Sequence, residues 1–103
     1  MLFSDRGVLN VGKSAYKVQG GKMVKVQLSS KVGKIEKIKI MGDFFLHPEE
    51  LIEEMEGMLI GSSLEESNLA DSIRILVGKR KATLLGVSPE DLAKCIVMAG
   101  VEQ

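Results

Sequence analysis

The sequence predicts an α+β fold, in which a three-stranded antiparallel sheet is covered on one face by about three helices. Short segments that alternate apolar and polar residues fill the first 42 positions, which is typical of half-buried strands. Apolar residues at helical spacing fill the second half of the chain. The two patterns meet in residues 40–50, IMGDFFLHPEE, so this stretch marks the change from strands to helices.

The 103 residues predict one domain spanning 1–103. Within it we expect a loosely ordered terminus over residues 1–13, a strand meander over 14–42 and a helical part over 47–100. No apolar run reaches the roughly 20 residues that span a bilayer, and no signal-peptide pattern follows Met1. The single cysteine excludes an internal disulfide, which fits a reducing compartment. We therefore expect a cytoplasmic protein that does not contact membranes.

The net charge is zero, but the charges are separated along the chain. Nine Lys or Arg against Asp5 and Glu36 give +7 over residues 1–42. Nine Asp or Glu without a base give −9 over residues 43–71, and five bases against three acids give +2 over the rest. This separation predicts a polarised surface that can orient a partner, or merely differently charged solvated faces.

Three strands are expected over residues 15–18, 23–29 and 36–41. A three-residue loop over 19–21 sets Tyr16 opposite Val24, and a second one over 31–33 sets Val24 opposite Ile40. One face is then apolar: Tyr16, Val18, Val24, Val26, Leu28, Ile38 and Ile40. On the other face Lys25 falls opposite Lys39, which makes a solvated lysine face or a surface for an acidic partner or a phosphate.

The first predicted helix begins at Pro48 and ends near Gly61. Its apolar stripe is Leu51, Met55, Met58 and Leu59. A capping box of Ser63 and Glu66 predicts the start of a second helix that ends near Gly78. The stripe of that helix is Leu69, Ile73, Leu76 and Val77, and Lys79, Arg80 and Lys81 at its end complement the helix dipole.

Residues 82–86 are expected to be a connector, and Ser88 with Pro89 predicts the cap and first position of a third helix. Its stripe is Leu92, Cys95, Ile96 and Ala99, and it ends at Gly100.

Catalytic and metal-binding patterns are absent from the sequence. His47 is the only histidine, and Cys95 lies on a predicted buried stripe. The five glutamates between residues 49 and 56 spread around one helix and are expected to be solvated. Nucleic-acid binding is not expected, because aromatic residues make up only 4 % of the chain and none lies among the lysines.

Two local features leave alternatives open. Gly20-Gly21-Lys22 fits an anion cradle or a hairpin turn. In Phe44-Phe45, alternation turns one ring inward and the other outward, where it would suit an interface; alternatively both rings are buried at the corner.

The segments YKVQGGKMVKV, residues 16–26, and IMGDFFLHPEE, residues 40–50, resemble the accessory (C-terminal) domain of lipoate–protein ligases. The likeness runs from about residue 13 to 100 and keeps the order of strands before helices. In that family a large catalytic domain uses lipoate and ATP to form lipoyl-adenylate and transfers lipoyl to acceptor-protein lysines. The accessory domain serves mainly the activation step, changes orientation before transfer, and is a separate polypeptide in some organisms.

The resemblance implies a heterodimer with a large catalytic subunit and, through it, contact with lipoyl acceptor proteins. It implies no catalytic residue here, and lipoate and ATP are expected only in the complex. The candidate interface or adenylate-proximal residues are Lys17, Gly20, Gly21, Lys22, Lys25, Gly42, Asp43, Phe44 and Phe45. Two other hypotheses remain: an iron–sulfur scaffold-like or sulfur-acceptor protein, against which the single helical cysteine argues, and an adaptor unrelated to lipoate.

Overall fold

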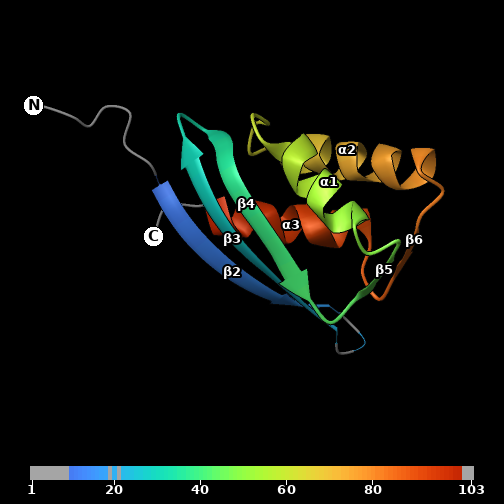
Figure 1. The fold of residues 1–103 in the computed structure, drawn as a ribbon. Helices are drawn as coiled ribbons and strands as arrows, with labels where there is room; N and C mark the ends of the chain where they lie inside the picture. Colours follow the sequence, from blue (N-terminus) through green and yellow to red (C-terminus); the bar gives the residue numbers. More distant parts are fainter. Residues whose placement is uncertain (1–9, 19, 21, 101–103) are drawn as a thin grey trace, which may run out of the picture.

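The computed structural model describes residues 10–18, 20 and 22–100 and has the predicted α+β architecture. Figure 1 shows the sheet on one side and the helices on the other. The strands are β2 (Asn10–Lys17), β3 (Met23–Lys31), β4 (Lys34–Gly42), β5 (Phe45–His47) and β6 (Thr83–Leu85). The helices are α1 (Leu51–Leu59), α2 (Glu66–Lys79) and α3 (Pro89–Gly100). In the described part of the chain, no helix has the length and apolarity needed to cross a membrane.

The first hairpin of the main sheet has the predicted register. The sheet order is β2-β3-β4, all antiparallel, and Tyr16 pairs with Val24. The Val18 N–H donates to the Lys22 carbonyl at 2.7 Å, which closes the loop where the sequence placed it. The strand begins earlier than expected, at Asn10, so residues 10–13 are strand and not loosely ordered terminus. Residues 1–9 lie outside the described residues.

The second hairpin is different, and its predicted register is wrong. Lys31 pairs with Lys34 across a two-residue turn of Val32 and Gly33, whose φ angles are 53° and 75°. A register shift between Ser29 and Ser30 makes Glu36 the extra residue of a bulge. These two changes move the pairing by two residues.

In the observed register Val26 pairs with Ile40, and Lys25 lies opposite Met41 rather than Lys39. Likewise Gln27 lies opposite Lys39 rather than Lys37. Because side chains alternate with period two, this shift leaves every predicted apolar residue on its predicted face.

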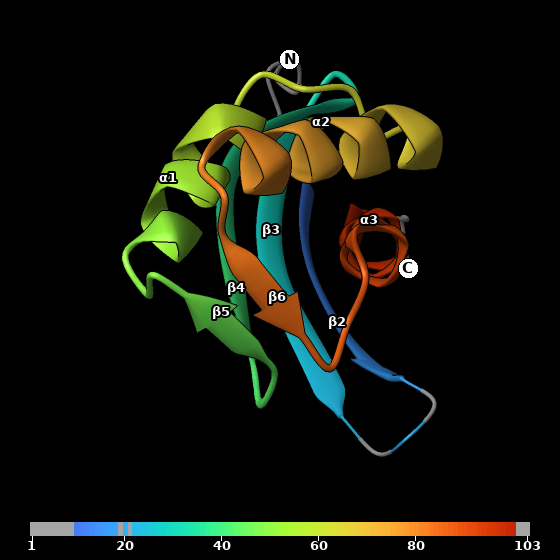
Figure 2. The same cartoon turned by 90° about the vertical axis from the view of Figure 1, so that its right-hand side faces the viewer.

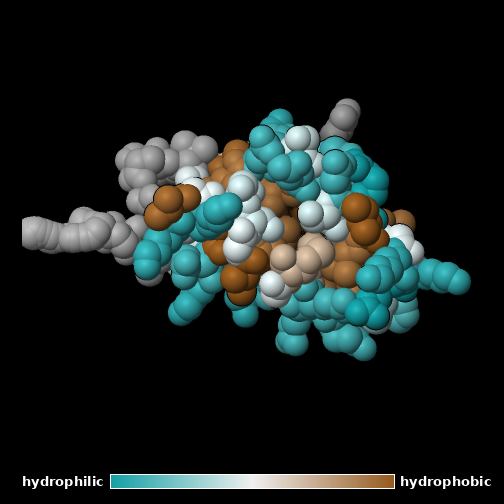
Figure 3. All heavy atoms as spheres, turned by 90° about the horizontal axis from the view of Figure 1, so that it is seen from above, coloured by the Kyte–Doolittle hydropathy of each residue, from teal (hydrophilic) through white to brown (hydrophobic). Residues whose placement is uncertain are grey.

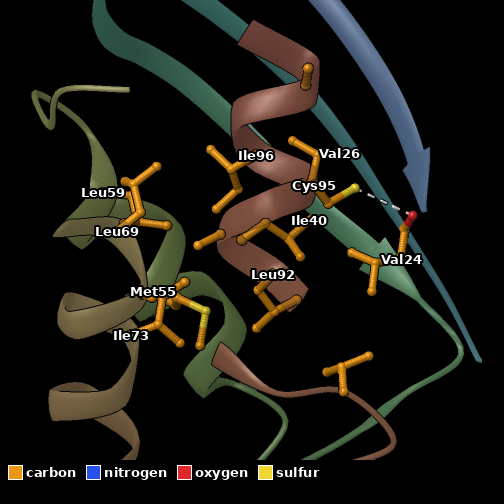
Figure 4. Close-up of a cluster of buried hydrophobic side chains, with 14 of the residues drawn as sticks. Val24, Val26, Ile40, Met55, Leu59, Leu69, Ile73, Leu92, Cys95 and Ile96 are labelled. Atoms are coloured by element: carbon orange, nitrogen blue, oxygen red, sulfur yellow. Dashed lines mark hydrogen bonds between the residues drawn. The ribbon is translucent and has the colours of Figure 1, made fainter. Parts of the chain in front are cut away.

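The core lies between the main sheet and the three helices. Figure 4 shows Val24, Val26 and Ile40 of the sheet meeting Leu92 and Ile96 of α3, with α1 and α2 completing the cluster. Each helix contributes the predicted stripe: Leu51, Met55 and Leu59 from α1, Leu69, Ile73 and Leu76 from α2, and Leu92, Cys95, Ile96 and Ala99 from α3. Met58, which was expected in the stripe of α1, is exposed.

The helix starts agree with the sequence only in part. Ser88 caps α3 as predicted: the Asp91 N–H donates to Ser88 Oγ at 3.1 Å, and the Ser88 N–H donates to the Asp91 carboxylate. The capping box of Ser63 and Glu66 does not form, since α2 begins after Glu65 and Ser63 bridges to Lys34 instead. Pro48 lies in a turn before α1, where the Leu51 N–H donates to its carbonyl.

The helix α3 packs closely against β2. A Cβ atom on Gly12 would lie 1.8 Å from the Ala99 carbonyl oxygen, so only glycine permits this approach. Ser14 Oγ donates to the Cys95 carbonyl at 2.6 Å, which fastens the same strand to the same helix. These contacts join the first and last elements of the described chain.

A second, two-stranded sheet was not predicted. β5 pairs with β6 antiparallel, with Phe45 opposite Leu85. Figure 1 shows this small sheet beyond the end of β4, and Figure 2 shows it in front of β3 and β4. The expected connector over residues 82–86 therefore contains a strand, and the stretch 40–50 contributes its partner.

Candidate functional site

The two segments that carry the family resemblance meet at one end of the main sheet. The Met23 N–H donates to Asp43 Oδ1 at 2.7 Å, and the Asp43 N–H donates to the Met23 carbonyl at 3.1 Å. This reciprocal pair joins the base of the β2–β3 hairpin to the connection between β4 and β5. We call this end of the molecule, with residues 17, 18, 20, 22–25 and 42–47, the hairpin end.

Gly42 permits the tight fit at the hairpin end. A Cβ atom there would lie 2.3 Å from the Met23 carbonyl oxygen and 2.9 Å from the Phe44 ring. The Met23 backbone and the Phe44 ring therefore occupy the space that a side chain at this position would need.

The three predicted lysines lie around this end. Lys17 is paired with Met23, next to the Asp43 contact, and Lys25 is paired with Met41. Lys22 packs its aliphatic stem near Gly86, before α3. Gly20 has a positive φ of 102° and serves the hairpin turn, while Gly21 is outside the described residues. Lys17 and Lys25 therefore lie on the open face of the sheet beside the Asp43 contact, whereas Lys22 lies toward Gly86.

Phe44 and Phe45 turn to opposite sides, as alternation predicts. Phe44 is half-buried against the core, whereas Phe45 is 51 % exposed. The Phe45 ring stacks on His47, with ring centroids 6.2 Å apart and planes at 4°. Across the small sheet Leu85 is 58 % exposed opposite Phe45. The exposed side of the small sheet, formed by Phe45, His47, Thr83 and Leu85, is here named the β5–β6 outer face.

An open hollow of about 550 Å³ adjoins this face. Its walls combine the apolar residues Ile40, Phe44, Phe45 and Ile52 with Glu49, Glu50 and Glu53. The other acids of α1 have partners: Glu56 accepts the Ile40 N–H at 2.8 Å, and Glu54 accepts from Arg80 Nε at 3.0 Å. The hollow is therefore acidic on its helical side and aromatic on its strand side.

Cys95, the only cysteine of the chain, is buried in the core. Burial raises the pKa of the Cys95 thiol, although its hydrogen bonds to Ser14 and the backbone act in the opposite direction. Its Sγ donates to the Val24 carbonyl at 3.5 Å in the core. No group of His, Cys, Asp and Glu suited to a metal ion occurs among the residues that the structure describes.

Sequence reasoning missed Leu85 and the stacking role of His47. Leu85 belongs to a three-residue strand whose partner lies about 40 positions earlier, and a segment that short gives no periodic signal. For His47, its alternation with Phe45 was the signal that puts both rings on one side.

Apolar side chains are also exposed on α1 and α2, away from the hairpin end. Seen from above the view of Figure 1, hydrophobic patches lie among hydrophilic side chains (Figure 3). The exposed apolar residues of α1, α2 and the turn after α1 are Met58, Ile60 and Ile75. This face carries neither of the two characteristic segments, and it offers a comparison surface for experiments.

The described chain is thus a small α+β domain whose two characteristic segments meet at the hairpin end. The family model described as bacterial lipoate protein ligase C-terminus matches residues 13–96. The chain belongs to this family, which confirms the resemblance given by the two segments.

A curated relative is lipoate-protein ligase A subunit 2 of Thermoplasma acidophilum, which is 39 % identical over 74 residues. The matched part covers 72 % of this chain and 76 % of the relative. A solved structure from work on an archaeal lipoylation system, a bipartite lipoate protein ligase and its E2 lipoyl domain from Thermoplasma acidophilum, has a TM-score of 0.74 and 30 % identity. That match covers 86 % of this chain and 97 % of the other, and it confirms the α+β fold.

Proposed function

We propose that this protein is the accessory subunit of a two-protein lipoate–protein ligase. It acts with a large catalytic subunit in the ATP-dependent conversion of lipoate to lipoyl-adenylate, and so in lipoylation of acceptor-protein lysines. The observation that carries the proposal is the meeting of both family segments at the hairpin end, through the Asp43–Met23 hydrogen bonds. The relative's description as subunit 2 supports a partner subunit. The expected setting is the cytoplasm.

The role that the hairpin end suits is docking rather than chemistry. The β5–β6 outer face offers an aromatic and an aliphatic side chain at the surface, the kind of group that anchors subunit contacts. Docking beside the nucleotide would exclude water from lipoyl-adenylate, a mixed anhydride that water hydrolyses. Lipoate and ATP are assigned to the complex, and none of the residues of this chain takes a catalytic role in the proposal.

Lys17, Lys22 and Lys25 are the groups that we place nearest to the phosphates. They gather at the end that carries Asp43 and Gly42, and an ammonium group can balance the charge of an adenylate. Gly20 then belongs to the turn that precedes Lys22.

Adenylate formation tests the function directly. The large subunit is assayed with ATP and lipoate, with and without this chain, and we expect lipoyl-adenylate to form faster when the chain is present. Lys22→Ala should reduce that gain, because it removes a charge from the hairpin loop. A rate that does not change on adding the wild-type chain would falsify the assignment, and an unchanged gain with all three lysines replaced by alanine would remove only their role.

Phe45→Ala tests the docking surface. We expect the affinity for the large subunit to fall at least about tenfold, since a half-exposed aromatic anchor is lost. Ile75→Ala is the matched control, because Ile75 is 66 % exposed on α2 and away from the hairpin end. Titration calorimetry with both variants measures the two dissociation constants. Weaker binding by the Ile75 variant alone would place the contact on the α1–α2 face instead.

A further inference from the structure

The open face of the main sheet carries lysines on all three strands. The helices cover only the opposite face (Figure 1). In the observed register one row across the sheet reads Lys13, Gln27, Lys39, and the next reads Val11, Ser29, Lys37. We call Lys13, Lys37 and Lys39 the distal lysine cluster. All three side chains are exposed.

This cluster lies along the sheet from the Asp43–Met23 contact, and Lys25 of the hairpin end adjoins it, since Lys13 and Lys25 line one hollow. Gln27 lies four residues along β3 from Met23, which is on the order of 13 Å at the rise of a strand. Lys13, Lys37 and Lys39 therefore lie too far from the Asp43–Met23 contact to form part of it. They need a different explanation from Lys17 and Lys22, which adjoin that contact.

The cluster surrounds a depression that fits an acidic side chain. A shallow hollow of about 300 Å³ is lined by Val11, Lys13, Gln27, Ser29, Lys37 and Lys39. Within the described ranges, none of these three lysines has a carboxylate within ion-pair distance. Ammonium groups gathered in this way repel one another in the free chain, and a carboxylate placed between them relieves the repulsion.

The composition of the face distinguishes between kinds of partner. Tyr16, Phe44 and Phe45 lie elsewhere in the described structure, so the face has no ring on which a nucleic-acid base could stack. Permanent subunit contacts are rich in apolar and aromatic groups, and those lie on the β5–β6 outer face. A charged, nearly ring-free surface instead suits a partner that approaches and leaves, because charges mainly steer encounter.

We propose that the distal lysine cluster is a docking surface for an acidic face of the protein that accepts the lipoyl group. This inference rests on the proposed function, in which the acceptor is the macromolecule that comes and goes. One Asp or Glu of the acceptor lies in the hollow between Lys13 and Lys39, and neighbouring acids meet Lys37. The cluster thereby holds the acceptor near the catalytic subunit without taking part in transfer.

The test uses the complex of this chain with its catalytic subunit, loaded with lipoyl-adenylate. Transfer to the acceptor protein is measured over a range of acceptor concentrations for wild type and for the double variant Lys13→Gln/Lys39→Gln. We expect the KM for acceptor to rise about three- to tenfold with kcat unchanged. The rate of adenylate formation and the affinity for the catalytic subunit should stay at the wild-type values.

The matched control is Lys79→Gln/Lys81→Gln, which removes the same charge at the end of α2 and should leave the KM for acceptor unchanged. Lys39→Glu should raise this KM further than Lys39→Gln does, because it replaces attraction by repulsion. Raising salt from about 50 mM to about 300 mM should raise the wild-type KM more than that of the double variant.

Two results would overturn the inference. The first is a KM for acceptor that changes equally in the double variant and its control. The second is a lower affinity for the catalytic subunit in the double variant, which would show that this face binds the catalytic subunit and not the acceptor. Both differ from failure of the proposed function, in which the wild-type chain itself would not accelerate adenylate formation.

Discussion

At Gly12 a single missing side chain decides how the sheet meets the last helix. Nothing in a lone glycine of the sequence indicates which backbone approaches it. In the structure the carbonyl of Ala99 occupies the place where a Cβ would stand. The residue that weakens β2 as a strand is therefore the one that allows α3 to pack on it.

Gly12→Ala is predicted to destabilise the fold by about 3 kcal/mol, because the 1.8 Å contact can be relieved only by moving β2 away from α3. Chemical denaturation followed by circular dichroism measures the change. Gly57→Ala is the control: Gly57 lies within α1 with open space around it, so alanine should stabilise by about 0.5–1 kcal/mol. Equal effects of the two substitutions would contradict the close packing.

At the scale of elements, the second hairpin shows where sequence reasoning reaches its limit. A two-residue turn with positive φ at both positions favours Asn-Gly, and valine is a poor residue for it, so a longer loop was the better prediction. The neighbouring chain overrides this local preference. The Ile35 N–H donates to the Ser62 carbonyl, and the Gly61 N–H donates to the Ile35 carbonyl, which fixes the start of β4.

Val32→Asn is predicted to stabilise the fold by about 1 kcal/mol, since asparagine tolerates positive φ and the 86 % exposed valine contributes almost no packing. Thermal or urea unfolding measures the gain. Val11→Asn is a suitable control because Val11 is 72 % exposed but lies in regular β2, where asparagine should give no gain. Loss of stability in the Val32 variant would show that this turn gains nothing from the substitution.

The helices illustrate the same limit in a smaller way. Ser88 and Ser63 are both serines placed three residues before an acid, and the sequence predicted a cap at each. Only Ser88 forms one, because Ser63 lies in the segment that pairs with β4. Whether a serine at such a position caps a helix therefore depends on tertiary contacts, which the local sequence pattern does not reveal.

At the scale of the whole molecule, the sequence predicted the fold class, the three-stranded order and the faces, because these depend on the period of the apolar residues. For Phe44-Phe45 it left two alternatives, one inward and one outward ring or two buried rings, and the structure has the first. The sequence did not indicate the β5–β6 sheet, since Leu85 and Phe45 are joined only by the folded chain. The sequence therefore indicates only one strand of the β5–β6 outer face. β5 lies in one of the two segments that carry the family resemblance, whereas β6 lies in neither.

The charge separation along the chain becomes a separation in space. Lysines lie on the open sheet face, and the acids of α1 border the hollow beside Phe45. With zero net charge the molecule has no overall attraction for a charged partner, but each side presents a distinct sign. Two sides of opposite sign favour binding of two different partners, one on each side.

The packing of α3 against the sheet also has a consequence for biosynthesis. While the ribosome is still producing the chain, the apolar face of the sheet has no cover from α3 until residues 89–100 have emerged. Val24 and Val26 are made early, and their helix partners Cys95 and Ile96 come about 70 residues later. The nascent sheet therefore exposes its core face to chaperones, or to aggregation with neighbouring chains, until synthesis has nearly finished.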